Sequence, residues 1–248
     1  MNRNLLFTVG AKGGTGKSKL TSLFADYLDR EGVPYQCFDC DGSTKTISHL
    51  YPDDDRVSFY EIRQQRDLDS MLQAAIDAPE PIVLADMRAG SDGDFIPIFR
   101  MVLDEMSDEL EDAELSVTAA AILANDNDSV FATAQWAKEL RDDVRWLFVR
   151  NEIFGEVTTL EQTEEGRKLL QACNPLSITI PQLNTLDAEA LKKNRLTVDR
   201  ALKLREEQLH IEHLSGLAPQ ARLKKFRTTV GKEFERIFPE LVHLSSPA

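Results

Sequence analysis

The sequence predicts an α/β fold with a mostly parallel central sheet and helices on both faces. Short apolar runs alternate with amphipathic helical patterns through most of the 248 residues, as in sheets whose strands are buried on both sides. A chain of this length can bury one large core. From residue 187 the pattern becomes continuously helical. We therefore expect a core over residues 1–186 and C-terminal helices over residues 187–248 that pack on this core or extend it.

The expected strands are short apolar runs, each followed by a turn or a helical pattern. They cover residues 5–9, 34–39, 81–86, 116–124, 145–149 and 176–180. The expected helices are stretches in which apolar side chains recur every three or four residues. They cover residues 20–28, 68–76, 95–111, 129–141, 160–172, 187–193, 197–214 and 219–237. Gly216 and Pro219 mark the turn before the last helix.

A glycine-rich turn joins the first strand to the first helix. The turn and the residues that open the helix are Lys12, Gly13, Gly14, Thr15, Gly16, Lys17, Ser18 and Lys19. Glycines let successive backbone N–H groups point at phosphate oxygens, and the helix N-terminus adds positive potential. Lys17 can reach the β- and γ-phosphates of a nucleotide, and the Ser18 hydroxyl can ligate Mg²⁺. The sequence therefore predicts a nucleoside triphosphate site, the alternative being a flexible turn with two chance lysines.

The turn differs from the general G-x-x-x-x-G-K-[ST] pattern at its first position. Ala11 stands where that pattern has glycine, and a second lysine, Lys12, follows it. A lysine there, followed by two glycines, resembles the deviant Walker A loop of the ParA/MinD family of ATPases, and the resemblance covers about residues 4–181. It implies a three-layer P-loop NTPase fold, ATP and Mg²⁺ as cofactors, and a homodimer that forms with ATP. Lys12 would then contact the nucleotide of the second subunit, whereas a solvated loop lysine is the alternative.

Carboxylates at two strand ends are candidates for holding the metal and a water. Asp86 ends the third strand after four apolar residues, as a Walker B aspartate does, and could hold the water shell of Mg²⁺. By the resemblance, Asp39 supports the metal site, Asp41 orients the attacking water, and the N–H of Gly90 reaches the γ-phosphate. Relatives commonly have Pro-Gln after the second aspartate, where this chain has Gly-Ser. A simple Asx turn at Asp41 is the alternative.

Two residues at the ends of late strands are candidates for contact with the base. The resemblance places an asparagine after one strand and a proline after the next, and Asn151 and Pro181 stand at these places. An asparagine amide both donates and accepts hydrogen bonds, so it can pair with a purine edge. Because strands often end in Asn or Pro, both roles depend on the resemblance.

Charge is distributed unevenly along the chain. The net charge is −13, yet residues 188–248 carry 12 Lys+Arg against 8 Asp+Glu. Arg222, Lys224, Lys225 and Arg227 form the densest basic group. The C-terminal basic helices are therefore candidates for non-specific contact with DNA or with an acidic partner, with ordinary charged surface as the alternative.

Cysteine content and hydropathy bear on the compartment. Three cysteines argue against a disulfide framework, and Cys37 and Cys40 lie in an expected strand, so we expect both in the core and the protein in the cytoplasm. No apolar run approaches the ~20 residues that span a bilayer, and we do not expect a membrane partner. One apolar stripe near the C-terminus would suit either the core or a membrane surface. Its residues are Phe226, Val230, Phe234, Ile237 and Leu241.

The sequence favours an ATP-driven molecular switch. By the resemblance, the protein would hydrolyse ATP slowly, respond to a protein partner that stimulates hydrolysis, and serve plasmid or DNA partition, positioning or conjugal DNA transfer. Residues 195–202 and 222–226 are similar to segments of the TraL-type ATPases of conjugative plasmids. The alternatives are a metabolic P-loop ligase or ATPase of the same superfamily and a MinD-like ATPase that attaches to membranes. Metabolic members generally lack the lysine that corresponds to Lys12, or carry cysteine clusters.

Overall fold

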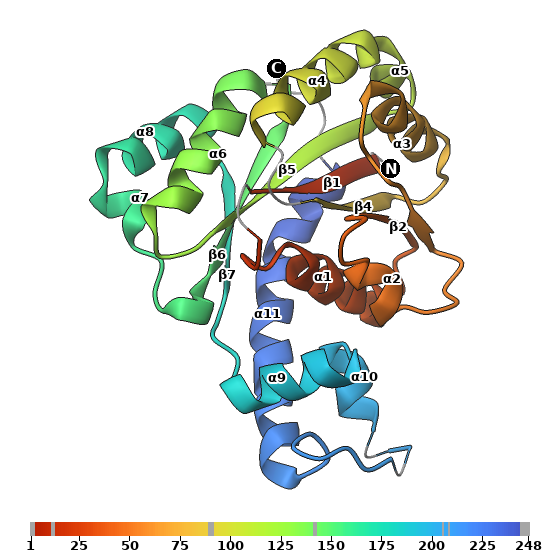
Figure 1. Ribbon diagram of the computed structural model, residues 1–248, viewed down its shortest axis with the longest axis vertical. Helices are drawn as coiled ribbons and strands as arrows, with labels where there is room; N and C mark the ends of the chain where they lie inside the picture. The colour runs from red at the N-terminus through yellow and green to blue at the C-terminus, as the bar shows by residue number, and fades with distance from the viewer. Residues whose placement is uncertain are drawn as a thin grey trace.

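A sheet of seven parallel strands forms the centre of the described chain (Figure 1). The computed structural model describes residues 3–10, 13–88, 92–140, 143–204, 206–207 and 209–243. The strands are β1 (Arg3–Val9), β2 (Tyr35–Cys40), β3 (Val57–Phe59), β4 (Ile82–Met87), β5 (Leu115–Leu123), β6 (Arg145–Asn151) and β7 (Leu176–Ile180). They lie in the order β3-β2-β4-β1-β5-β6-β7, and all neighbours are parallel. The predicted fold class is confirmed.

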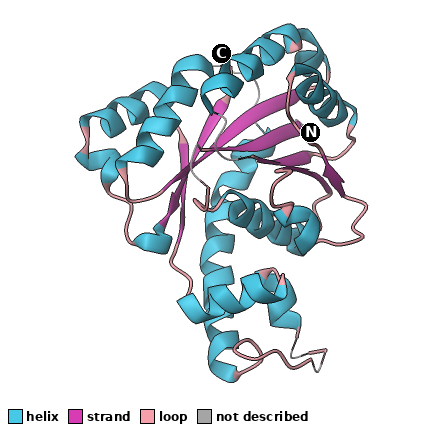
Figure 2. Ribbon diagram, viewed as in Figure 1, coloured by secondary structure: helices cyan, strands magenta, loops and turns pink. Residues whose placement is uncertain are grey.

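Helices cover both faces of this sheet, as Figure 2 shows. One face is covered by α1 (Lys17–Glu31), α2 (Thr46–Leu50) and α11 (Leu217–His243). On the same side, α9 (Thr185–Asn194) and α10 (Val198–Lys203) pack against α11 and α1 and extend away from the sheet. The other face is covered by α3 (Gln65–Asp77), α4 (Asp92–Glu105), α5 (Ser107–Asp112), α6 (Asn127–Leu140), α7 (Thr159–Gln162) and α8 (Glu164–Cys173). A short 3-10 helix, η1 (Glu152–Phe154), follows β6. The sheet therefore lies between two layers of helices.

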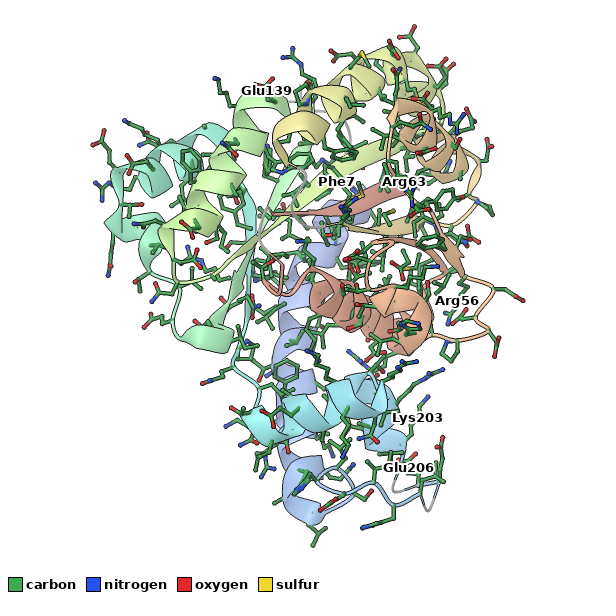
Figure 3. All side chains as sticks on the ribbon, in the orientation of Figure 1. Phe7, Arg56, Arg63, Glu139, Lys203 and Glu206 are labelled. Atoms are coloured by element: carbon green, nitrogen blue, oxygen red, sulfur yellow. The ribbon has the colours of Figure 1, made fainter. Side chains whose placement is uncertain are left out.

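Alternating side chains of the central strand β1 supply both layers of the core. Leu6 packs in the layer under α1, whereas Leu5 and Phe7 pack in the opposite layer. The ring centroid of Phe7, labelled in Figure 3, lies 4.6 Å from that of Phe99 in α4 and 6.0 Å from that of Trp136 in α6. The strand is therefore held on both sides close to its carboxyl end, where the glycine-rich turn begins.

The two cysteines of β2 are buried on opposite faces of the sheet. Cys37 lies in the layer under α1 and Cys40 in the opposite layer, because residues three apart in a strand point to opposite sides. Burial raises the pKa of both thiols well above the ordinary value. They are core residues, as expected, and their opposite directions keep them from forming a disulfide with each other.

Helix α11 belongs to the core and covers one edge of the sheet. The apolar stripe that the sequence allowed for core or membrane is buried, and Phe226 is its most exposed residue at 6%. Glu233 Oε2 accepts a hydrogen bond from the N–H of Thr179, 3.2 Å away, which satisfies a backbone group of the edge strand β7. The stripe therefore packs in the core. In the described part of the chain, no helix combines the length and hydropathy needed to cross a bilayer.

Three predicted helices differ from those observed. The helix expected over residues 95–111 is divided at Met106 into α4 and α5. The helix expected over residues 197–214 ends at Lys203. Leu214 fits the helical spacing of apolar residues and is fully buried, but it lies in a turn. The helix expected over residues 160–172 is divided in two, because Thr163 is extended and its side chain caps α8. Strand β3 has only three residues and is missing from the sequence prediction for that reason.

Candidate functional site

The glycine-rich turn lies at the carboxyl edge of the sheet, between β1 and α1. Two of its glycines take conformations that other residues rarely adopt, with φ of +80° at Gly14 and +107° at Gly16. A Cβ atom on Gly16 would also lie 2.6 Å from the amide nitrogen of Asn151. The positive φ therefore favours glycine at position 16, and a larger residue there would also displace the Asn151 side chain. Gly13 and Gly14 are exposed, whereas Thr15 is buried.

The two lysines that open α1 point in different directions. Lys17 is 7% exposed, and its Nζ donates a hydrogen bond to the carbonyl oxygen of Gly10, 2.9 Å away, so it folds back over the turn. A lysine in that position can bind phosphate oxygens through charge-assisted hydrogen bonds. Lys19 faces α11 instead, with its Nζ 5.8 Å from the ring centroid of Phe226. Burial lowers the pKa of Lys19 to about 8, although the nearby Asp26 raises it.

Asp86 is the second-last residue of β4, beside the turn, and is 1% exposed. Burial raises the pKa of Asp86 to about 7; a hydrogen bond from the Ser18 side chain opposes this rise, and the nearby Asp39 carboxylate adds to it. The Oδ2 atom of Asp86 is buried and has no hydrogen-bond partner among the described residues. A cation would satisfy such an oxygen. Asp86 and Ser18 therefore fit the Mg²⁺ ion that the sequence predicts for them.

Asp39 lies beside Asp86 on the neighbouring strand, but its oxygens are engaged within the chain. Its Oδ2 accepts hydrogen bonds from the N–H and the hydroxyl of Ser48 in α2, both at 2.8 Å. Its Oδ1 accepts one from the N–H of Asp41 at 3.3 Å. Asp39 thus ties α2 and the start of the following loop to the sheet. If Asp39 supports the metal site as predicted, it would do so by positioning α2 and the start of this loop.

Asp41 follows β2 and organises a local turn. Its Oδ1 accepts hydrogen bonds from the N–H and the hydroxyl of Ser43, at 3.0 and 2.5 Å, and its Oδ2 accepts one from the hydroxyl of Thr44 at 3.1 Å. Burial raises the pKa of Asp41, but these hydrogen bonds outweigh it and leave the pKa below its ordinary value. The Asx turn is therefore present, and it holds an ionised, partly exposed carboxylate that could orient a water.

Asn151 and Pro181 lie at the ends of two adjacent strands. Asn151 ends β6 and pairs with Ile180 of β7, which Pro181 follows. The Asn151 amide nitrogen donates a hydrogen bond to the carbonyl oxygen of Thr15, 2.7 Å away. The side chain predicted to contact a base therefore also holds the glycine-rich turn in place. Contact of either residue with a base stays a prediction.

Two predicted site residues lie outside the part of the chain that the structure describes, and two residues that contact the site carboxylates were not predicted. Lys12 and Gly90 lie outside the described residues, so their roles stay predictions. Thr8 of β1 contacts Asp86, and Ser48 of α2 contacts Asp39, yet neither belongs to a predicted motif. A lone hydroxyl inside the apolar run of β1 is a signal that could have indicated Thr8. No comparable signal marks Ser48.

Three solved structures share this fold over almost the whole chain. They are the MinC:MinD cell division protein complex of Aquifex aeolicus (TM-score 0.57, 11% identity), the MinD cell division protein of Aquifex aeolicus (0.56, 12%) and the septum site-determining protein MinD complexed with Mg-ADP from Pyrococcus horikoshii OT3 (0.55, 13%). Each comparison covers 98% of this chain and 98% or 100% of the matched chain. No protein-family model and no curated protein matches the sequence. The chain therefore has the P-loop NTPase fold of these structures, with Lys17 and Asp86 at the carboxyl edge of its sheet.

Proposed function

We propose that this protein is an ATPase that acts as a molecular switch: it binds ATP with Mg²⁺, dimerises in that state and hydrolyses the nucleotide slowly. The observation that carries the proposal is the convergence of Lys17, Ser18 and Asp86 at the glycine-rich turn, with an Asp86 oxygen that is buried and has no partner in the described chain. The fold supports it, since the P. horikoshii MinD structure of this architecture is complexed with Mg-ADP.

Each site residue has its own task in this proposal. The backbone N–H groups of the turn and the Lys17 ammonium group would hold the β- and γ-phosphates. When bound through Ser18 and Asp86, Mg²⁺ supplies positive charge to the phosphate oxygens. Asp41 would orient the attacking water. Lys12 would contact the nucleotide bound to a second copy of the chain and so link ATP binding to dimerisation.

The setting that we propose for the switch is plasmid or DNA partition, positioning, or conjugal DNA transfer. A protein partner would stimulate hydrolysis, and the existence of a MinC:MinD complex supports a partner protein on this fold. Direct binding of DNA would use the basic C-terminal helices.

Hydrolysis and oligomeric state test the core of the proposal together. We expect a monomer without nucleotide or with ADP, and a dimer with ATP and Mg²⁺, by sedimentation velocity. ATP hydrolysis should be measurable and should require Mg²⁺. A protein that binds no nucleotide, or whose sedimentation is the same with and without ATP, would contradict the switch.

Asp41→Ala is expected to slow hydrolysis about 10²-fold without loss of ATP binding, because the carboxylate would orient water rather than hold the nucleotide. The ATP-bound dimer should therefore persist. Single-turnover hydrolysis and nucleotide affinity, measured on the same preparation, check this. Asp55→Ala, at an exposed aspartate, is the control and should behave as the wild type. Loss of nucleotide binding in the Asp41 variant would instead place this residue among the groups that hold the metal.

Only part of the basic group on α11 is available to DNA. Arg222 donates two hydrogen bonds to the Asp187 carboxylate, at 2.6 and 2.7 Å. Arg227 lies 3.8 Å from a carboxylate oxygen of α10. Lys224 and Lys225 are exposed. A duplex would therefore contact these two lysines first.

The double substitution Lys224→Glu with Lys225→Glu is expected to weaken duplex binding by the ATP-bound protein. The dimer carries the lysine pair twice and phosphate contacts act together, so wild-type binding should also fall steeply with salt. A gel-shift assay at low salt measures both effects. Arg167→Glu with Lys168→Glu makes the same charge change on α8, across the sheet from α11, and is the matched control. Equal binding by the α11 variant and the wild type would assign another role to this group.

A further inference from the structure

Strands β1 and β4 separate at their carboxyl ends, next to the glycine-rich turn. Their pairing stops at Phe7 and Ala85. Each strand continues for two more residues with its other neighbour, β1 with β5 and β4 with β2. The two backbones therefore part at the level of Thr8 and Asp86.

The Thr8 side chain bridges this separation. Its Oγ1 accepts a hydrogen bond from the N–H of Met87 at 3.0 Å, in place of a backbone carbonyl of the ladder. Its O–H donates to Oδ1 of Asp86 at 3.5 Å. The other carboxylate oxygen, Oδ2, has no partner among the described residues. Strand β1 thus contacts one oxygen of Asp86 and leaves the other for a ligand.

Packing alone does not explain a threonine at this position. Thr8 is fully buried in β1, between the apolar residues Phe7 and Val9. Valine has almost the same shape and favours strands as strongly, so the core would accept it without a hydroxyl. A buried hydroxyl is stable where specific partners satisfy it. Both partners of Thr8 lie at the end of β4, and one of them is the proposed Mg²⁺ carboxylate.

We propose that Thr8 is a positioning residue for the metal site, whose hydroxyl orients the Asp86 carboxylate so that Oδ2 faces the cation. This inference rests on the proposed function, because it requires that Asp86 helps to hold Mg²⁺ with the nucleotide. Residues that orient a metal ligand from outside the coordination shell change metal affinity about 10- to 100-fold when they are removed. Thr8 acts on the metal through Asp86 alone.

Titration of Mg²⁺ against the binding of a fluorescent ADP analogue tests this role without hydrolysis. Thr8→Val should raise the Mg²⁺ concentration at half-maximal binding about 10-fold and leave binding in EDTA unchanged. Thr8→Ser keeps the hydroxyl and should restore the wild-type midpoint. Thr118→Val is the matched control. Thr118 is a fully buried threonine of β5 whose Oγ1 accepts a hydrogen bond from Asn4 at 2.9 Å, so its loss also leaves a buried group unpaired.

The outcomes separate this inference from the proposed function. A folded Thr8→Val protein with the wild-type Mg²⁺ midpoint overturns the positioning role, and so does an equal rise in the Thr118→Val control. If the wild type does not bind the analogue, or binds it equally well with and without Mg²⁺, the proposed function is overturned and the positioning role with it. If Thr8→Val does not fold, Thr8→Ala takes its place in the Mg²⁺ titration, because this variant also lacks the hydroxyl. Circular dichroism establishes folding for each variant.

Discussion

Lys17→Ala is expected to weaken the binding of ATP and ADP by about 10²- to 10³-fold. The lysine is 7% exposed and its Nζ lies 2.9 Å from the carbonyl oxygen of Gly10, so the side chain is already ordered over the turn. A preordered ammonium group loses little freedom when it binds phosphate. Its removal would leave buried phosphate charge uncompensated, a loss of about 3–4 kcal/mol.

Calorimetric titration with each nucleotide measures this loss. Lys168→Ala is the control, because Lys168 is an exposed lysine of α8 that pairs with Glu164 at 2.6 Å. This variant should bind nucleotide as the wild type does. Thermal unfolding should be recorded for both variants, since the Lys17 hydrogen bond also belongs to the fold. Unchanged affinity in a folded Lys17→Ala protein would contradict the assignment of the turn to phosphate.

The second large effect concerns stability, and its source is a buried acid on α1. Asp26 is 4% exposed; its Oδ1 accepts a hydrogen bond from the Tyr51 hydroxyl and its Oδ2 one from the N–H of Asp199, both at 3.1 Å. Burial, and then the charge of Asp199, raise the pKa of Asp26 from 3.8 to about 6. The folded protein therefore binds this proton more tightly than the unfolded chain does. The resulting stability is fully present below about pH 4 and is lost as the pH rises through 6.

Asp26→Asn is expected to raise the free energy of unfolding at pH 8 by about 3 kcal/mol, since each of about two pKa units corresponds to about 1.4 kcal/mol. The amide suits the site. Its oxygen can accept the N–H of Asp199, and its NH₂ can donate to the Tyr51 hydroxyl. The single Tyr51 hydroxyl proton would then be donated to the carbonyl oxygen of Ser22, 3.1 Å away, instead of to residue 26. The gain should shrink as the pH falls from 7 toward 4. Urea unfolding at several pH values measures it.

Asp55→Asn serves as the control for this effect. Asp55 is exposed, so its replacement should change stability little at any pH. A stability gain at Asp26 that is the same at pH 5 and pH 8 would show that ionisation is not its cause. A variant less stable than the wild type at pH 8 would show that the amide cannot replace the carboxylate's hydrogen bonds.

Local patterns were enough to predict the turn and every strand of the sheet except the three-residue β3. Strand β7 has the predicted bounds 176–180, and β4 is one residue from the predicted run 81–86, because a short apolar run between turn residues suits a strand buried on both faces. The conformation of Gly16 also follows from local chemistry, since a positive φ before a helix favours glycine. The fold class and the place of the phosphate site therefore depend on segments that are contiguous in the sequence.

Contacts between distant segments depended on tertiary structure. Asn151 holds the carbonyl group of Thr15 across 136 residues, and Thr8 meets Asp86 across 78 residues. A carboxylate, amide or hydroxyl can pair with any suitable donor or acceptor that folding brings near, so residue type alone does not identify its partner. Both oxygens of Asp39 accept hydrogen bonds, while one oxygen of Asp86 has no partner among the described residues, although the two residues pair near the ends of adjacent strands. Only the packing of β1, β4 and α2 produces that difference, because these hydrogen bonds form between elements that meet only in the folded chain.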